Sequence, residues 1–231
     1  MTKIKIAFQG EKGAYSHIAS ENLFKDAEVK TCSTFEETFK TAFEDESYKI
    51  IIPLENSLAG RVADIHYLLP KYKLQIYGEH FQKVEHSLLA KPEAQLKDIK
   101  FVRSHAQAIG QCQAFIIKNK LQTIISADTA GSAKELAAGN DISIAAIASE
   151  LSAQIYKLKI LKKNIEDESG NVTRFLIMGK GIHQPEYSSS KKYITSCIFR
   201  LKSTPSALYK SLGGFATNQI NLTKLESFSV K

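Results

Sequence analysis

The sequence predicts an α/β fold divided into two lobes, and three observations carry that prediction. Short apolar segments alternate with longer segments of helical period, an order typical of a parallel sheet covered by helices. Residues 74–90 form a long extended stretch with little helical period, which is placed to carry the chain from one lobe to the other. The chain has 231 residues, of which 43% are hydrophobic, so it can bury a sizeable core.

The elements up to residue 180 follow from the spacing of apolar positions. Phe35, Phe39 and Phe43 recur every four residues and therefore share one face of a helix. Patterns of this kind predict helices over 15–24, 35–43 and 149–156. Short apolar runs predict strands over 4–9, 48–53, 99–103 and 123–126, and a strand or buried run over 141–147. The stretch 158–175 then returns the chain to the first lobe.

A break in regular structure is expected over 181–192, where Gly181, Pro185 and consecutive serines occur together. The segment after this linker, 193–231, has a pattern of its own. It predicts a strand over 193–201, a helix over 205–212 with a proline near its first turn, and a strand over 220–230.

Composition disfavours several classes of protein. The formal net charge is +7, but the lysines are scattered and no arginine-rich stripe occurs, which argues against nucleic acid binding. No apolar run is long enough to span a membrane and the N-terminus lacks a signal-peptide pattern, so we expect a cytoplasmic protein. The scattered cysteines, Cys32, Cys112 and Cys197, fit reduced thiols rather than a disulfide framework.

Four expected strand ends share one pattern, in which the strand runs into small and hydroxyl residues before a helix begins. These segments are 10–16, 54–60, 104–108 and 128–132. A helix N-terminus presents free backbone N–H groups with a partial positive charge, and small residues let an anion approach them. In open parallel sheets, ligands bind at the carboxyl ends of the strands. If the lobes face each other there, the cleft forms an anion site, although capping alone would explain each segment.

Residues 171–175, with the sequence NVTRF, lie between a polar turn and an apolar strand. Arg174 is one of four arginines in the chain, and its guanidinium offers a planar pair of donors that matches a carboxylate. The hydroxyl of Thr173 can donate or accept a hydrogen bond. The segment suits a small, oxygen-rich anion, and a strand-start cap beside a surface arginine is the simpler explanation.

Together these segments resemble the prephenate dehydratase family, and the resemblance covers essentially the whole chain. Four family motifs are matched, at 10–16 (GEKGAYS), 53–57 (PLENS), 104–108 (SHAQA) and 171–175 (NVTRF). The tail, from residue 206 onward, resembles the start of the family's regulatory ACT domain. The chain departs from the family pattern at His17, where glutamate is common, at Ala106, where proline is common, and at Arg61, where a small residue is usual.

The resemblance implies a catalytic domain over 1–180 with two lobes like those of type 2 periplasmic binding proteins. The active site would lie between the first lobe, 1–78 with 160–180, and the second lobe, 79–159. It implies conversion of prephenate to phenylpyruvate, water and carbon dioxide in phenylalanine biosynthesis, without metal or organic cofactor. A homodimer or larger homo-oligomer is implied as well. Arogenate dehydratase and a non-catalytic binder of an aromatic or dicarboxylic metabolite are the alternatives.

Residue by residue, the resemblance assigns catalytic roles to Thr173, Arg174 and His105. Thr173 would hydrogen-bond the leaving hydroxyl and Arg174 would pair with a carboxylate. His105 would be a general acid, or else a helix-capping or supporting residue. Binding and positioning would fall to Ser16, Asn56, Ser57, Ser104, Gln107, Thr129, Ala130, Asn171 and Phe175.

Three further residues allow a structural explanation. We expect His86 to pack in a half-buried strand. Glu55 is either an acid or base or a structural carboxylate bonded to backbone N–H groups, because an ionised carboxylate in contact with a dianionic substrate would repel it. Cys112 is expected to be a small core residue rather than a nucleophile.

The C-terminal segment matches only the first βαβ part of the βαββαβ ACT unit, so the resemblance implies a truncated, incomplete ferredoxin-like domain. In that topology a later strand lies between the first two, and we therefore expect a poorly packed segment or one completed by another chain. Part of the effector motif is present at Ala207, Leu208, Glu226 and Ser227, which implies a weakened response to phenylalanine.

Overall fold

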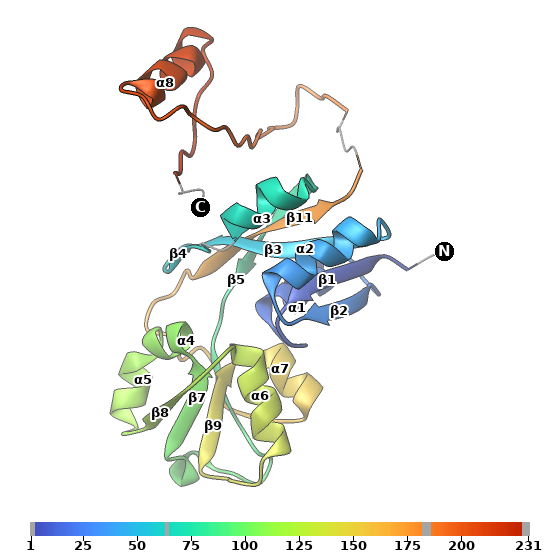
Figure 1. Cartoon of the computed structure of the whole chain (residues 1–231). Coiled ribbons are helices and arrows are strands. Elements are labelled where there is room, and N and C mark those ends of the chain that lie inside the picture. The colour runs from blue at the N-terminus through green and yellow to red at the C-terminus, as the bar shows by residue number, and fades with distance from the viewer. Residues whose placement is uncertain (1–2, 63–64, 182–185, 228–231) are drawn as a thin grey trace. The chain divides into compact units, whose positions relative to one another are not determined.

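The computed structural model describes residues 3–62, 65–181 and 186–227. The chain forms two compact units, Met1–His183 and Gln184–Lys231. The larger unit contains two mixed sheets with helices packed on them, so the predicted α/β architecture is confirmed (Figure 1). Among the residues that the structure describes, no helix is long and apolar enough to cross a membrane.

The first sheet has the strand order β2-β1-β3-β11-β5, and the short strand β4 pairs with β3. Its strands are β1 (Lys5–Gln9), β2 (Glu28–Cys32), β3 (Tyr48–Asn56), β4 (Gly60–Arg61), β5 (Gln75–Lys83) and β11 (Val172–Gly179). Strand β1 is parallel to β2 and β3, whereas β11 is antiparallel to β3 and β5. Strand β11 therefore brings a late part of the chain back between two early strands.

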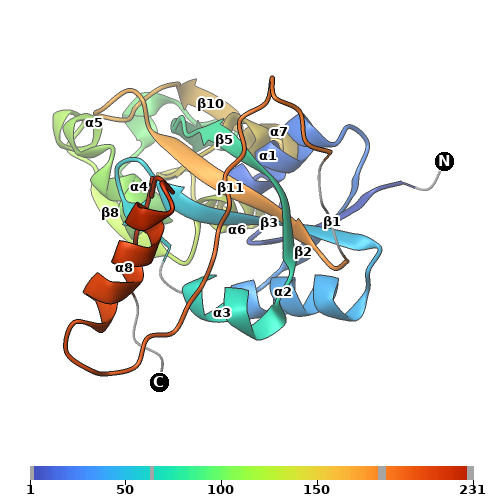
Figure 2. The ribbon, with the colours of Figure 1, turned by 90° about the horizontal axis from the view of Figure 1, so that it is seen from above.

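Helices cover both faces of this sheet, and three residues of β3 show why. The helices are α1 (Tyr15–Leu23), α2 (Phe35–Glu44) and α3 (Ile65–Tyr72). Successive side chains of a strand point to opposite faces, so Ile51 joins the cluster under α1 while Ile50 and Ile52 join the cluster under α2 and α3. All three isoleucines are fully buried. Figure 2 shows α2 and α3 side by side.

The second sheet has the order β10-β6-β9-β7-β8. Its strands are β6 (Ser87–Ala90), β7 (Phe101–His105), β8 (Gln122–Ser126), β9 (Ile144–Ala148) and β10 (Lys159–Lys162). Its helices are α4 (Ala106–Gly110), α5 (Gln113–Lys118), α6 (Thr129–Ala138), α7 (Glu150–Tyr156) and the 3₁₀ turn Leu96–Asp98. The carboxyl ends of β7 and β9, and the helices that follow them, lie toward the first lobe (Figure 1).

The chain crosses between the lobes at 84–86 and again at 163–171, since β5 belongs to the first sheet through Lys83 and β10 to the second through Lys162. The expected crossings near 79 and 160 therefore move by several residues. The two crossings lie side by side, because the Val84 N–H donates to the Asn171 carbonyl at 2.8 Å and the Ile165 N–H donates to the His86 carbonyl at 3.0 Å.

Some expectations for the larger unit are wrong. The segment 54–60 does not lead into a helix, because β3 runs on to Asn56 and turns back as β4. The fourth strand end followed by a helix is instead that of β9, where Ser149 caps α7. Strand β2 was not predicted, because Glu28 and Lys30 interrupt any apolar run on this edge strand. His86 does not lie in a strand but in the first crossing.

The smaller unit contains one regular element, α8 (Ala207–Thr217), among its described residues 186–227. The strand predicted over 193–201 is absent, and so is the described part of the strand predicted over 220–230. A strand needs a hydrogen-bonded neighbour, and the predicted topology would have separated these two by a third strand that 186–227 does not supply. Phe199 and Phe215 nevertheless approach each other, with ring centroids 6.1 Å apart.

Candidate functional site

A one-residue irregularity in β3 decides which side chains meet at the start of β11. Phe175 is opposite Pro53, but Arg174 is opposite Glu55, so Leu54 has no counterpart. This β-bulge shifts the pairing by one residue, as bulges beside functional sites often do. As a result Thr173 is opposite Asn56. Without the bulge, Thr173 would face the carboxylate of Glu55 instead of an amide.

The Asn56 side chain holds the Thr173 hydroxyl in one orientation. Its Oδ1 accepts from the backbone N–H groups of Leu58 and Ala59, at 3.1 and 2.9 Å, which leaves its Nδ2 as the donor end. Nδ2 donates to Thr173 Oγ1 at 2.9 Å and to Asn171 Oδ1 at 2.6 Å. Among the described residues, Thr173 Oγ1 thus accepts one hydrogen bond, from Asn56, and its own proton remains available for a ligand. Thr173 is 9% exposed.

Residues of the second lobe and of the first crossing extend this network. Asn171 Nδ2 donates to Gln111 Oε1 at 2.9 Å, and His86 Nε2 lies 2.9 Å from the same oxygen. The hydroxyl of Tyr15 lies 3.1 Å from His86 Nδ1 and 2.6 Å from the Glu85 carbonyl, so its one proton faces two acceptors. Burial lowers the pKa of His86 and raises that of Tyr15. The motif comparison missed Gln111, although it lies four residues, about one helical turn, beyond Gln107.

Arg174 lies on the other face of β11, because neighbouring side chains in a strand alternate. Its guanidinium pairs with Glu55 at 3.0 Å and with Glu79 at 2.7 Å, and stacks near Phe81 at 5.9 Å from the ring centroid. Partial burial opposes the charge, but the two carboxylates outweigh it and raise the pKa of Arg174. The side chains of Arg174 and Thr173 therefore do not meet, because they point to opposite faces of β11. Glu55 Oε1 accepts from this guanidinium at 3.0 Å.

The predicted residues of the second lobe lie at the starts of α4 and α6, apart from Ser104. Ser104 is fully buried and donates to the Ile147 carbonyl at 2.6 Å, which ties β7 to β9. His105 and Gln107 are exposed, and His105 Nδ1 accepts from the Gln107 N–H at 3.3 Å as a helix cap. Thr129 and the buried Ala130 open α6.

The remaining predicted residues belong to the first lobe. Ser57 exchanges hydrogen bonds with the return crossing, since its N–H donates to the Val172 carbonyl at 2.9 Å and its Oγ accepts from the Val172 N–H at 3.0 Å. Ser16 is buried in the first turn of α1. Phe175 is 2% exposed and packs in the core of the first lobe. Cys112 is also confirmed as a core residue, and burial raises the pKa of its thiol.

A second contact joins the lobes at Gly13. The hydroxyls of Ser149 and Ser152 donate to the Gly13 carbonyl at 2.6 and 3.1 Å. Gly13 has φ +94° and approaches Ser152 so closely that a Cβ would come within 2.8 Å of the Ser152 Cα, so only glycine fits. His17 Nδ1 accepts from the Gly13 N–H at 3.1 Å, and burial lowers the pKa of His17.

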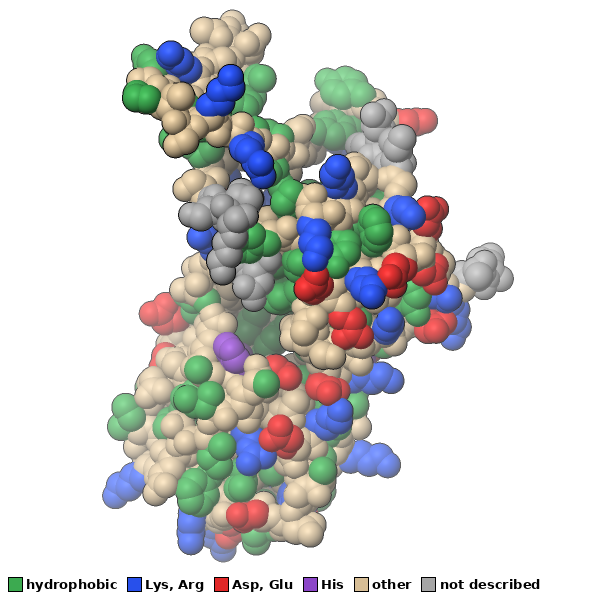
Figure 3. Space-filling model, in the orientation of Figure 1, with side chains coloured by type: hydrophobic (Ala, Val, Ile, Leu, Met, Phe, Trp, Pro, Cys, Tyr) green, Lys and Arg blue, Asp and Glu red, His purple; other side chains and the backbone are tan. Residues whose placement is uncertain are grey.

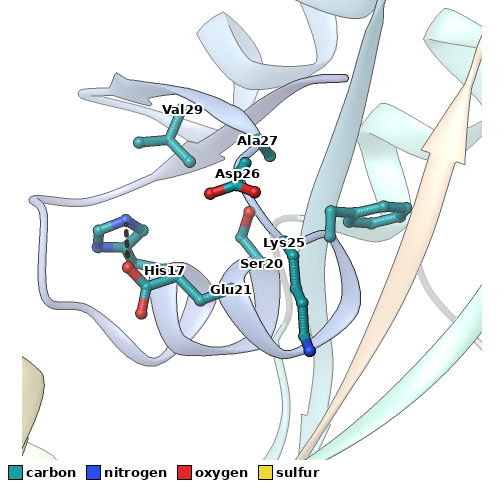
Figure 4. A pocket seen from close by; sticks show the side chains of 8 residues that line it. His17, Ser20, Glu21, Lys25, Asp26, Ala27 and Val29 are labelled. Atoms are coloured by element: carbon teal, nitrogen blue, oxygen red, sulfur yellow. Dashed lines mark ion pairs between the residues drawn. The ribbon is translucent and has the colours of Figure 1, made fainter. Parts of the chain in front are cut away.

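The surface contains several hollows. Figure 3 shows a recess where the two lobes meet, on a face whose positive and negative side chains are interspersed. A hollow of about 380 Å³ lies on the first lobe between α1 and β2, where His17 and Glu21 approach to 3.6 Å (Figure 4). A second, of about 340 Å³, lies beside Thr41 and Tyr48. Neither hollow is lined by a predicted site residue. Among the described residues, no group of three or more His, Cys, Asp or Glu side chains is arranged to hold a metal ion.

Comparison with known proteins gives one consistent result. A family model described as prephenate dehydratase matches residues 6–182. A "bifunctional N-acyl-homoserine lactone acylase/prephenate dehydratase" of Komagataeibacter europaeus is 39% identical over 98% of this chain and 80% of its own length. An "arogenate dehydratase/prephenate dehydratase 2" of Arabidopsis thaliana is 38% identical over 98% of this chain and 59% of its own length.

Solved structures agree with these sequence relatives. A structure described as a novel type of quorum quenching acylase, GqqA, has a TM-score of 0.84 and 37% identity, and covers 98% of this chain and 82% of its own. A prephenate dehydratase of Arthrobacter aurescens in complex with L-Phe has a TM-score of 0.84 at 24% identity, and covers 97% of this chain and 76% of its own. The second likeness shows a shared fold.

Proposed function

Because the chain belongs to the prephenate dehydratase family, we propose that it converts prephenate to phenylpyruvate with the network around Thr173. The observation that supports this most directly is the orientation of the Thr173 hydroxyl, which accepts from Asn56 and keeps its proton for a ligand. Asn56, Asn171 and Thr173 all come from the predicted site.

The reaction makes modest demands on the protein. The dianion of prephenate and one proton give the phenylpyruvate anion, carbon dioxide and water. Electrons of the breaking C–C bond enter the ring, which becomes aromatic, and those of the breaking C–O bond leave with the hydroxyl oxygen. A donor aimed at that oxygen stabilises the charge that develops on it. Thr173 donates this hydrogen bond, and the proton that completes the water comes from a stronger acid or from solvent.

The substrate carboxylates bind to the starts of α4 and α6 in this proposal. Gln107, Thr129 and Ala130 lie there, and the N-terminus of a helix favours negative charge. His105 acts as the cap of α4, since its Nδ1 accepts a backbone N–H. The predicted contact between Arg174 and a carboxylate stays a prediction, because its guanidinium already pairs with Glu55 and Glu79. The neutral amides beside Thr173 do not repel a dianion, whereas the carboxylate of Glu55, which the bulge keeps away from Thr173, would repel it.

The test is to incubate the purified chain with prephenate and to follow phenylpyruvate, for the natural protein, Thr173→Ala and Thr173→Ser. Loss of a preorganised donor lowers kcat about 10²- to 10³-fold, so we expect Thr173→Ala to fall by this amount and Thr173→Ser to retain more activity. Absence of phenylpyruvate with the folded natural protein would refute the activity. Equal rates for all three proteins would refute only the role of Thr173. Arogenate as a parallel substrate shows which of the two is preferred.

A second candidate activity is hydrolysis of N-acyl-homoserine lactone. The supporting observation is the 39% identity to the bifunctional relative, together with the 37% identity to the quorum quenching acylase. Release of homoserine lactone and the free fatty acid, measured by mass spectrometry, tests it. The same reaction with Thr173→Ala shows whether both activities use one site, because a shared site would lose both.

Binding of phenylalanine by the smaller unit is proposed to be weak. Ala207 and Leu208 open α8, but Glu226 and Ser227 lie outside any helix or strand. Residues 186–227 thus form no sheet that would bring these parts of the effector motif together. A calorimetric titration with phenylalanine should give little heat at micromolar concentrations, and tight binding with reduced activity would contradict this.

A further inference from the structure

The side-chain hydrogen bonds that lead from Asn56 to His86 have a fixed direction. Asn56 Oδ1 is committed to two backbone N–H groups, so Asn56 Nδ2 must donate to Asn171 Oδ1. Asn171 Nδ2 then donates to Gln111 Oε1. Reversing either of these amides would place one N–H donor against another. The direction set at the hairpin between β3 and β4 is therefore transmitted to Gln111.

His86 completes this chain at its other end. Since Gln111 Oε1 can only accept, His86 Nε2, at 2.9 Å, must carry a hydrogen. We propose that His86 is a positioning residue for Thr173, because its Nε2–H keeps the Gln111 oxygen turned toward Asn171 and thereby supports the Asn171–Asn56 pair from which Thr173 accepts. This inference rests on the proposed function and adds to it a residue that touches no substrate.

The surroundings of His86 leave its ring little freedom. The residue is 2% exposed. Its backbone N–H donates to Glu166 Oε2 at 2.9 Å and its carbonyl accepts from the Ile165 N–H, so the return crossing holds its main chain. The Tyr15 ring packs edge-on against the imidazole with centroids 5.9 Å apart. A ring fixed in this way can set the orientation of a mobile amide such as Gln111.

Loss of the Nε2–H would have a directional effect. Gln111 could then turn its amide nitrogen to the place of its oxygen, where it would donate toward position 86 but oppose the donor Asn171 Nδ2. Relief requires Asn171 to turn as well, which opposes the donor Asn56 Nδ2. Asn56 itself is held by Leu58 and Ala59. The mismatch therefore extends to the Asn56–Asn171 pair beside Thr173 rather than ending at Gln111.

Two substitutions of His86 distinguish the roles of its two ring nitrogens. The amide nitrogen of glutamine can occupy the place of His Nε2, whereas that of asparagine can only reach the place of Nδ1. We expect His86→Gln to have a kcat about tenfold or more above that of His86→Asn, because only the latter leaves buried polar groups unpaired. KM for prephenate should change little in either variant, since His86 does not contact the substrate. Thermal melts confirm that both variants are folded.

A measurement that does not depend on activity uses nitrogen NMR. In the natural protein the imidazole of His86 should show a proton on Nε2, and the side-chain amide signals of Asn56 and Asn171 should move in His86→Asn but not in His86→Gln. An unprotonated Nε2, unmoved amides in His86→Asn, or equal kcat in both variants would overturn the proposal. If the natural protein formed no phenylpyruvate, the proposed function would fail, and the amide signals would still decide whether His86 directs the network.

Discussion

The two faces of the sheet at the start of β11 carry opposite chemistry, although they are served by adjacent residues. The Thr173 face consists of neutral amides and hydroxyls whose orientation is set by backbone groups. On the Arg174 face, the guanidinium of Arg174 lies between two carboxylates, whose side chains are 31% and 35% exposed. Neutral groups of fixed direction suit a dianionic substrate, whereas partly exposed ion pairs mainly contribute modest stability. The bulge at Leu54 maintains the separation, because it keeps Glu55 away from Thr173.

Exchanging amide and carboxylate on the two faces gives the largest expected contrast. Asn56→Asp replaces the donor Nδ2 with an anionic oxygen beside Thr173 and Asn171, and we expect kcat/KM for prephenate to fall about 10²- to 10³-fold. Glu55→Gln makes the converse isosteric change on the other face and should cost less than about tenfold. Steady-state kinetics of both variants test this, and similar losses in the two would show that the faces are not distinct.

Substitution of Gly13 tests whether the contact between the lobes is as tightly packed as the Thr173 face. Gly13→Ala combines a positive φ with a clash against Ser152, and we expect a loss of about 2–4 kcal/mol in the free energy of unfolding. Gly60 also has a positive φ, +80°, but nothing lies within 4 Å of an added Cβ. Gly60→Ala should therefore cost only the backbone strain, about 1–2 kcal/mol. Urea denaturation would contradict the packing argument if the two variants lost equal stability.

Salt distinguishes the Arg174 face from the neutral face. Arg174→Met leaves Glu55 and Glu79 without their shared cation, and we expect a loss of about 1 kcal/mol at low ionic strength. This loss should shrink in about 1 M salt, where charges are screened over a few ångströms. The stability cost of Thr173→Ala should not depend on salt. A salt-independent loss in Arg174→Met would point to packing on Phe81 as its main contribution.

The smallest expected effect is on the pH dependence of stability. Burial lowers the pKa of His17, whose Nδ1 accepts the Gly13 N–H, so the folded protein favours its neutral form. The unfolded chain therefore binds more protons as the pH falls below about 6.5, and the free energy of unfolding decreases. His86, whose pKa burial also lowers, acts in the same direction. Urea midpoints between pH 7.5 and 5.5 should fall for the natural protein and fall less for His17→Gln.

Part of the site was predictable because its signals are local. The strand ends at 10–16 and 104–108 are visible as small residues after apolar runs, and both lead into helices. Thr173 and Asn56 were singled out from short motifs, and the structure places them in contact. Gln111 and His86 carry no local signal of this kind. They join the site because the two crossings run side by side. The hydrogen bond between His86 and Glu166, for example, joins residues that are 80 positions apart in the sequence.

By itself, then, the sequence determined the α/β order of elements, the buried faces of strands such as β3, and the polar residues that follow them. Alternation and apolar spacing act within a few residues and need no partner. Tertiary structure alone decided that Asn56 rather than Glu55 meets Thr173, that Arg174 pairs with two carboxylates, and that the predicted strand over 193–201 does not form. Each of these depends on strand pairing and register, which depend on residues far apart in the chain.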